Sequence, residues 1–409
     1  MALDWITRDG KLLLYARIVR TFSYGFLSII LAIYLKLSGF NEILIGIVLS
    51  ATLVNSVIFN LFSSAYADRI GRKKILTVYA VLMVISAVIF FLTSNYMALI
   101  IAALVGTINV TGSEVGAFLS LEQAILPQTV NDIKKRNSIF ALYNMVGTFA
   151  MAGGVLVSGL PNFLEQHYGL GQISAIKTLF IFYAVLALVV MGIYLALSKK
   201  IEIQVQTGQG LPRKTISPQT RGIIAKMSSL FAVDSFAGGF VIQSIVAFWF
   251  YSKFGADLTM LSYIFSVAGV LTAVSFLLAT KIASKIGLIN TMVFTHIPSN
   301  ILLIFLAFAP NFSLAILLYL ARMSLSQMDV PTRQSYIVSI VNENERVAAA
   351  GITNTSRNVA QAISPSLAGA VIQVLSLSAP FVVGGILKIA YDIGMFVNFR
   401  KIKPPEEEI

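Results

Sequence analysis

The chain alternates between long apolar segments and short polar connections along almost its whole length. Twelve apolar runs reach about 20 residues, the length that an α-helix needs to cross about 30 Å of hydrocarbon. The runs lie roughly at 12–36, 43–66, 75–94, 97–125, 138–160, 175–198, 227–252, 258–280, 288–309, 312–338, 348–374 and 379–399. We therefore predict an all-α integral membrane protein with twelve transmembrane helices.

The composition excludes most other classes of protein. The 409 residues are 57% hydrophobic and 12% charged, with a mean hydropathy of +0.83. One soluble core of this length could not bury so much apolar side chain, so lipid must serve as solvent. The chain has no cysteine, and His167 and His296 are its two histidines, which excludes thiol nucleophiles, thiolate or His-rich metal sites and a Ser-His-Asp triad. We therefore expect no enzyme activity, no metal and no cofactor.

The placement of the cations predicts the orientation of the chain in the membrane. If both termini face the cytoplasm, 21 of the 30 Lys and Arg residues lie in or beside cytoplasmic segments, and three (Lys36, Lys177 and Lys253) lie outside. This asymmetry follows the positive-inside rule and indicates a multi-pass protein of the cytoplasmic membrane with both termini inside. Because topology explains the net charge of +12, we expect no nucleic-acid partner.

A charged turn separates the second and third runs. It reads Ser64-Ala-Tyr-Ala-Asp68-Arg69-Ile70-Gly71-Arg72-Lys73-Lys74. The turn resembles the loop signature of the major facilitator superfamily of secondary transporters, Gly-x-x-x-Asp-Arg-x-Gly-Arg-Arg/Lys-Arg/Lys, with Ser64 in place of the first glycine.

The resemblance implies a fold of two pseudo-symmetric six-helix bundles and a monomeric transporter. It also implies that the turn joins helices 2 and 3 on the cytoplasmic side and acts as a conformational latch. In that latch Asp68, together with Arg69, Gly71 and Arg72, would hold helix 2 against a neighbouring helix.

An internal repeat supports two halves. Three matches recur at nearly constant offsets of 214, 216 and 211 residues: Arg20 to Phe26 with Asp234 to Phe240, Asp68 to Gly71 with Ser284 to Gly287, and Glu122-Gln123 with Arg333-Gln334. We predict an N-terminal half at 1–198, a cytoplasmic linker at 199–222, and a C-terminal half with a short cytoplasmic tail at 223–409. Parallel halves of this kind are an architecture of secondary transporters.

Ionisable side chains inside the apolar runs are the candidates for function. A charge inside a bilayer costs at least about 2.5–3.5 kcal/mol, so it normally faces protein or water and has a partner. Eleven such residues are present: Arg17, Arg20, Glu114, Glu122, Asp234, Arg322, Asp329, Arg333, Arg357, Lys388 and Asp392. The family resemblance implies that helices 1, 4, 7 and 10 line a central cavity, and most of these charges lie on those helices.

The repeat exchanges charge signs between the halves. Arg20 corresponds to Asp234, and Glu122 corresponds to Arg333. Within each half we therefore predict the pairs Arg20 with Glu122 and Asp234 with Arg333. The four residues form either a network that exchanges partners as the halves rock, or two static pairs. Lys388 and Asp392 are four residues apart, which predicts a further structural pair on helix 12.

Two carboxylates are candidates for proton coupling. Glu114 has no cation in its own run and is the first candidate, and Asp329, between Arg322 and Arg333, is the second. Candidate substrate contacts are the remaining polar residues of the repeat and the buried cations, although contacts with neighbouring helices explain them equally well. They are Arg322, Asn354, Arg357 and Asn144.

We interpret the chain as a secondary active transporter that moves a small organic solute by alternating access, with proton coupling and with efflux of drug-like compounds favoured. Run 5 has the paired glycines Gly153-Gly154 of the helix-5 element of related antiporters but lacks its Gly-Pro. These glycines indicate either export or close helix packing. A first alternative is a transporter of organic or inorganic anions, and a second is a non-transporting receptor or scaffold. No nucleotide-binding loop is present, which leaves ion gradients or facilitation as the energy source.

Overall fold

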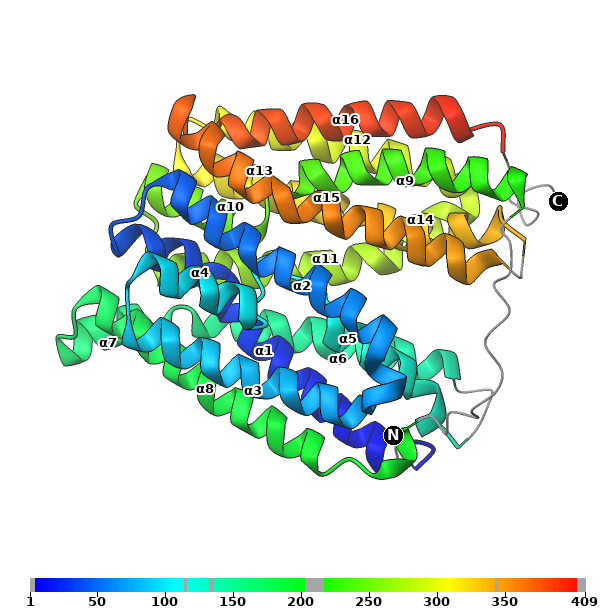
Figure 1. The fold of residues 1–409 in the computed structure, drawn as a ribbon. Coiled ribbons are helices and arrows are strands. Elements are labelled where there is room, and N and C mark those ends of the chain that lie inside the picture. The colour runs from blue at the N-terminus through cyan, green and yellow to red at the C-terminus, as the bar shows by residue number, and fades with distance from the viewer. Residues whose placement is uncertain (1–3, 114–115, 132–135, 203–216, 343–344, 403–409) are drawn as a thin grey trace. The chain divides into compact units, whose positions relative to one another are not determined.

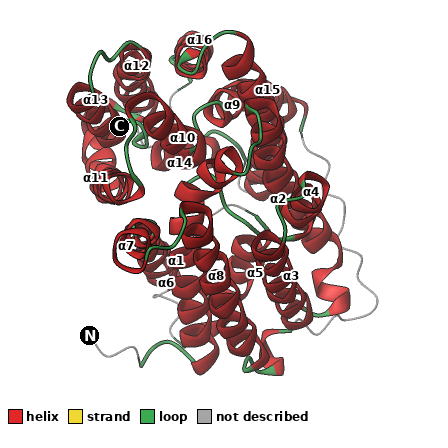
Figure 2. Ribbon diagram, turned by 90° about the vertical axis from the view of Figure 1, so that its left-hand side faces the viewer, coloured by secondary structure: helices red, strands yellow, loops and turns green. Residues whose placement is uncertain are grey.

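The computed structural model describes residues 4–113, 116–131, 136–202, 217–342 and 345–402. These residues are almost entirely helical and contain no strand beyond a single bridge between Ile6 and Val130 (Figure 2). Nine segments of them are long and apolar enough to cross a membrane. The segments match nine of the predicted runs. The other three correspond to split or more polar helices, so the count of twelve stays a prediction.

The chain divides into two compact units. The first comprises residues 1–208 and 242–266, and the second comprises residues 209–241 and 267–409. Helices of the first are α1 (Arg8–Leu37), α2 (Glu42–Ile70), α3 (Arg72–Leu92), α4 (Tyr96–Val105), α5 (Ala117–Ile125), α6 (Arg136–Val157), α7 (Leu160–Tyr168), α8 (Gln172–Leu195) and α10 (Gln243–Phe254), with 3-10 turns η1 (Leu126–Thr129) and η3 (Lys199–Ile201).

The second unit is built from the remaining helices. They are α9 (Pro218–Gly239), α12 (Leu288–Ala307), α13 (Phe312–Leu325), α14 (Asp329–Ser339), α15 (Arg346–Val374) and α16 (Ala379–Phe399). Helix α11 (Leu258–Ile286) begins in the first unit and ends in the second. Within the second unit, α12 runs beside α16, and α9 runs beside α15 (Figure 1).

Three of the predicted runs are interrupted in the structure. The breaks separate α4 from α5, α9 from α10, and α13 from α14. In the first break Gly112 and Gly116 take positive φ values of 76° and 117°, a backbone that a helix cannot contain. In the third break, Pro331 falls in the first turn of α14. Proline is tolerated there because an N–H at that position would have no acceptor within the helix.

Groups on neighbouring helices bond to the backbone around the break after α4. The amide of Asn55 donates to the carbonyl of Leu104 at 2.6 Å, and the hydroxyl of Ser86 donates at 2.9 Å to the carbonyl of Ala102, which also accepts from the N–H of Gly106. The backbone N–H of Ser244, at the start of α10, donates to the carbonyl of Val110 at 3.2 Å. Irregular backbone at membrane depth requires such internal partners, because lipid supplies none.

The sequence repeat extends to the starts of the helices. Equivalent helices of the two halves begin with the same chemistry, an Asn or Asp side chain that accepts from the first turn or a glycine with positive φ. The pairs are Asn41 and Asp257, Asn95 and Asn311, and Gly71 and Gly287, each 216 residues apart. The duplication thus shaped the turns as well as the helices.

Glycines allow α1 and α6 to approach at backbone distance. A Cβ atom on Gly154 would lie 1.8 Å from the carbonyl oxygen of Phe22, and one on Gly25 would lie 2.3 Å from that of Met151. The neighbouring Gly153 is different, because the nearest atoms to its Cβ position are 4.0 Å away on the Phe22 ring. Close packing therefore accounts for Gly154.

We predict that Gly154→Ala lowers thermal stability and Gly153→Ala does not. The Gly154 methyl group would push α1 and α6 apart, at a typical cost of about 1–3 kcal/mol for overpacking. A methyl group added at position 153 meets open space. It should stabilise the folded protein by about 0.4–1 kcal/mol, because alanine lowers the conformational entropy of the unfolded chain. Melting temperatures of the two purified variants in one detergent make the comparison, and equal temperatures would contradict the packing role.

Candidate functional site

A buried ion pair lies in the first unit. Arg20 on α1 and Glu122 on α5 are both 0% exposed. Nη1 of Arg20 donates to Oε1 of Glu122 at 3.0 Å, and Nη2 donates to Oε2 at 2.6 Å. This two-point geometry is the strongest that arginine and a carboxylate form. The contact is the one that the repeat predicts within the N-terminal half.

Two tyrosines complete the surroundings of Glu122. The hydroxyl of Tyr194 on α8 donates to Oε1 at 2.7 Å, and the hydroxyl of Tyr143 on α6 donates to Oε2 at 2.5 Å. Each carboxylate oxygen therefore accepts two hydrogen bonds. The guanidinium of Arg17 lies over the Tyr143 ring, with Cζ 4.4 Å from its centroid. We name Arg17, Arg20, Glu122, Tyr143 and Tyr194 the Glu122 cluster.

The sequence analysis missed both tyrosines because it considered charged side chains. A signal was available, since a tyrosine in the middle of an apolar helix needs a partner for its hydroxyl when it is buried. Both residues are fully buried. That signal does not identify the partner, which lies on another helix.

A second cluster surrounds Asp234 on α9, in the second unit. Nζ of Lys388 on α16 donates to Oδ1 of Asp234 at 2.6 Å. Nη1 of Arg333 on α14 and Nη1 of Arg357 on α15 each donate to Oδ2 at 3.3 Å. Arg333 also donates to Asp329, one turn earlier on α14, at 2.5 Å. These five residues are the Asp234 cluster, and all but the half-buried Arg357 are buried.

The Asp234 cluster includes the predicted pair of the C-terminal half, Asp234 with Arg333. It also brings in Asp329, Arg357 and Lys388, which the sequence placed on three different helices without linking them. Whether the four charges predicted from the repeat exchange partners across the halves stays a prediction.

The predicted pair of Lys388 with Asp392 is wrong. Lys388 reaches Asp234 on another helix, and Asp392 is bonded to His296 Nδ1 at 2.8 Å and to Asn300 Nδ2 at 3.0 Å. Spacing along one helix identifies side chains on one face but carries no information about partners on neighbouring helices. Here Asp234 pairs with Lys388, and His296 and Asn300 bond to Asp392, so these contacts between helices replace the predicted pair within one helix.

The remaining candidates are not members of either cluster as defined above. Arg322 on α13 is 7% exposed, and among the described residues it has no carboxylate partner. Its Nε lacks a hydrogen bond, and its Nη1 lies 3.4 Å from Sδ of Met323. The side chains of Asn144 on α6 and Asn354 on α15 are exposed. Glu114, the first candidate for proton coupling, lies outside the described residues.

The charged turn between α2 and α3 has an unpredicted partner. Nε of Arg72 donates to Asp68 at 2.9 Å, while Arg69 is exposed and Gly71 has a φ of 106°. The carboxylate of Glu202, just after η3, accepts from the backbone N–H groups of Arg72 at 2.6 Å and Lys73 at 3.0 Å. An acidic group at a helix N-terminus compensates its open donors and its dipole. The latch role of Asp68 stays a prediction.

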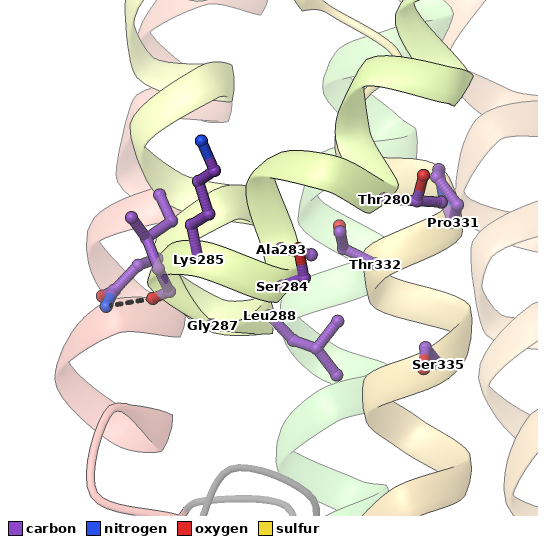
Figure 3. Close-up of a pocket in the computed structure, with 11 residues that line it drawn as sticks. Thr280, Ala283, Ser284, Lys285, Gly287, Leu288, Pro331, Thr332 and Ser335 are labelled. Atoms are coloured by element: carbon purple, nitrogen blue, oxygen red, sulfur yellow. Dashed lines mark hydrogen bonds between the residues drawn. The ribbon is translucent and has the colours of Figure 1, made fainter.

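A cavity of about 610 Å³ opens in the second unit, where α11 ends and α12 begins beside α14. Figure 3 shows Thr280, Ser284 and Thr332 around it, with Lys285 extending from the α11 side. Ser335 and Pro331 contribute from α14. None of the predicted site residues lines this cavity, so it is separate from the charge clusters.

We predict that Arg20→Ala and Glu122→Ala each reduce folded protein strongly. Removing one member of a buried pair strands the other, at a typical cost of about 3–5 kcal/mol. The exchange of Arg20→Glu with Glu122→Arg restores opposite signs and imitates the polarity of Asp234 and Arg333. It should recover much of the expression that either single reversal loses, measured by size-exclusion chromatography in detergent.

The exposed pair of Lys36 and Glu42 provides the control. Its side chains are 41% and 20% exposed and 2.6 Å apart, so Lys36→Ala should cost about 0–1 kcal/mol. Additive losses in the double-mutant cycle, without rescue, would show that Arg20 and Glu122 do not stabilise one another.

Comparisons with known proteins agree with this architecture. The uncharacterized membrane protein YJR124C of Saccharomyces cerevisiae (strain ATCC 204508 / S288c) is 26% identical over 417 residues, covering 95% of this chain and 93% of the yeast protein. The crystal structure of the nucleoside transporter NupG matches with a TM-score of 0.73 at 17% identity, covering 96% of this chain and 100% of that one. The crystal structure of a D-xylose-proton symporter matches with a TM-score of 0.71 at 15% identity, covering 95% and 96%.

At these identities the two structures establish the fold alone. The family model of the Major Facilitator Superfamily matches residues 13–360, which is most of the chain and includes both charge clusters apart from Lys388. Together with the apolar helices, this match identifies the chain as a multi-pass membrane transporter that belongs to the Major Facilitator Superfamily.

Proposed function

We propose that the protein is a proton-coupled secondary active transporter of a small organic solute, and that it works by alternating access in the cytoplasmic membrane as a monomer. The observation that supports this proposal most is the Asp234 cluster. Its carboxylate receives donors from α14, α15 and α16 at once. Buried ionisable groups in membrane proteins mark ion and substrate pathways.

The cluster has the properties that proton coupling needs. Arg333 is shared between Asp234 at 3.3 Å and Asp329 at 2.5 Å, so it has two alternative carboxylate partners. Protonation of either carboxylate removes its attraction for Arg333, so that Arg333 pairs with the other carboxylate alone. A proton would thereby change which helices the cluster holds together, which is a local charge event with a wider structural consequence.

An anionic solute is a second candidate, favoured by the balance of charge. Three cations share two carboxylates in the Asp234 cluster, and Arg322 has no carboxylate partner among the described residues. Guanidinium groups bind carboxylates and phosphates well because their donors match these groups in geometry. The proteins of similar fold include a nucleoside transporter and a D-xylose-proton symporter, so likeness of fold selects no solute for this chain.

Export remains the direction that we propose, on the basis of Gly153-Gly154 in α6. Gly154 already has a packing role against Phe22. A receptor or scaffold is disfavoured, because it gains nothing from several ionisable side chains kept inside the protein at a desolvation cost.

We predict that Asp329→Asn and Glu114→Gln abolish solute accumulation driven by a pH gradient but retain counterflow. Each amide preserves the shape of the carboxyl group and removes its titration. A thermal-shift screen of a solute library at two pH values supplies the solute, and proteoliposomes with an imposed gradient supply the assay. Glu165→Gln, at an exposed position of α7, is the matched control and should behave as wild type. Wild-type accumulation in both test variants would exclude these two carboxylates as proton carriers.

A further inference from the structure

One buried titratable pair lies beside the Asp234 cluster and has no role in it so far. His296 on α12 and Asp392 on α16 are 3% and 1% exposed, and Nδ1 of His296 lies 2.8 Å from Oδ1 of Asp392. The amide of Asn300, one turn after His296, donates to Oδ2 of Asp392 at 3.0 Å. Both carboxylate oxygens are therefore engaged by α12.

The pair is continuous with the Asp234 cluster. Asp392 lies one helical turn after Lys388, whose ammonium group binds Asp234. Both His296 and Asp392 interact electrostatically with Asp234. The helices around α12 carry these titratable or charged groups: Lys388, Tyr391 and Asp392 on α16, Asp329, Arg333 and Tyr336 on α14, and Tyr319 and Arg322 on α13.

The pair and the Asp234 cluster together form a network of compensated charge, which Arg322 does not join by an ion pair among the described residues. Asp234, Asp329 and Asp392 supply three negative charges to this network, and Arg333, Arg357 and Lys388 supply three positive ones. The sum is zero when the imidazole of His296 is neutral and +1 when it is protonated. One proton on His296 therefore decides whether the buried network has an uncompensated charge.

The chemistry of the pair assigns the atoms. An ionised Asp392 can only accept, and in that state Nδ1 carries the hydrogen of the neutral imidazole and Nε2 is the atom left to take up a proton. The carboxylate orients the ring and stabilises the imidazolium that forms. Histidine is also the side chain that ordinarily changes charge between about pH 5 and 8.

We propose that His296 and Asp392 form a proton-binding site of coupled transport in addition to Asp329 and Glu114, and that its occupancy sets the net charge of the network that joins this pair to the Asp234 cluster. This inference rests on the proton coupling proposed above and adds a site to it. A protonated His296 repels Lys388, Arg333 and Arg357 and favours an anionic group near them. Loss of the proton restores neutrality, so proton binding and release alternate between two charge states of one network.

The first experiment uses the histidine content of the chain. Because His167 and His296 are the two histidines, protein labelled with ¹⁵N-histidine gives two imidazole signals, and His167→Asn assigns them. We expect the His296 signal to change with pH in the wild-type protein and to change at lower pH in Asp392→Asn, because the imidazolium there loses its carboxylate. A His296 signal that is constant over the whole pH range in which the wild-type protein stays folded would overturn the proposal, whether or not any variant folds.

The second experiment tests the role in transport with the solute found by the thermal-shift screen. His296→Gln should lose accumulation driven by an imposed pH gradient and retain counterflow, and its counterflow should no longer vary with pH. His167→Gln, at an exposed position of α7, should match wild type in both assays.

The outcomes separate this inference from the proposed function. A His296→Gln variant that keeps the wild-type pH profile, in a protein that a pH gradient drives, would overturn the site and leave the coupling intact. A wild-type protein that no pH gradient drives would overturn the coupling itself, and the proposed site with it.

Discussion

The high cost of an unpaired charge away from water is the constraint on which this structure depends. In the first unit Glu122 on α5 gathers donors from α1, α6 and α8. In the second unit Asp234 on α9 gathers donors from α14, α15 and α16. In the order of the twelve predicted runs, these helices belong to runs 1, 4, 5 and 6 in the first unit and to runs 7, 10, 11 and 12 in the second. One carboxylate per unit thus joins helices of equivalent runs, although it lies in run 4 in one unit and in run 7, the equivalent of run 1, in the other.

The same constraint acts on the backbone. Interrupted helices expose carbonyl and N–H groups, and the break after α4 is bridged by Asn55, Ser86 and the N–H of Ser244. Each bridge comes from a different helix, so a break that weakens one helix also binds its neighbours to it. Polar atoms in this chain therefore position the helices, while the apolar side chains, which pack as well against lipid as against protein, supply less discrimination between arrangements.

These contacts explain what the sequence could and could not predict. The apolar runs and the repeat suffice for the helices and for the pairs Arg20 with Glu122 and Asp234 with Arg333, because both halves carry the same pattern. The prediction of one continuous run at 97–125 rests on its length and overlooks the three glycines and the polar side chains at 106–116, which signal the break. Partners on other helices, such as Tyr194 for Glu122 or His296 for Asp392, follow from tertiary packing that no spacing encodes. The predicted pair of Lys388 with Asp392 failed for that reason.

The two clusters differ in a way that assigns them different tasks. The partners of Glu122 include two neutral hydroxyl groups, which remain hydrogen-bonded whatever the charge on the carboxyl group, so the four helices stay joined. The three partners of Asp234 are all cations. Under the proton coupling that we propose, removing negative charge there would leave like charges a few ångströms apart, and their repulsion would push apart the helices that carry them. The proposed conversion of proton binding into movement therefore fits the Asp234 cluster better than the Glu122 cluster, whose hydroxyl partners would keep its helices joined.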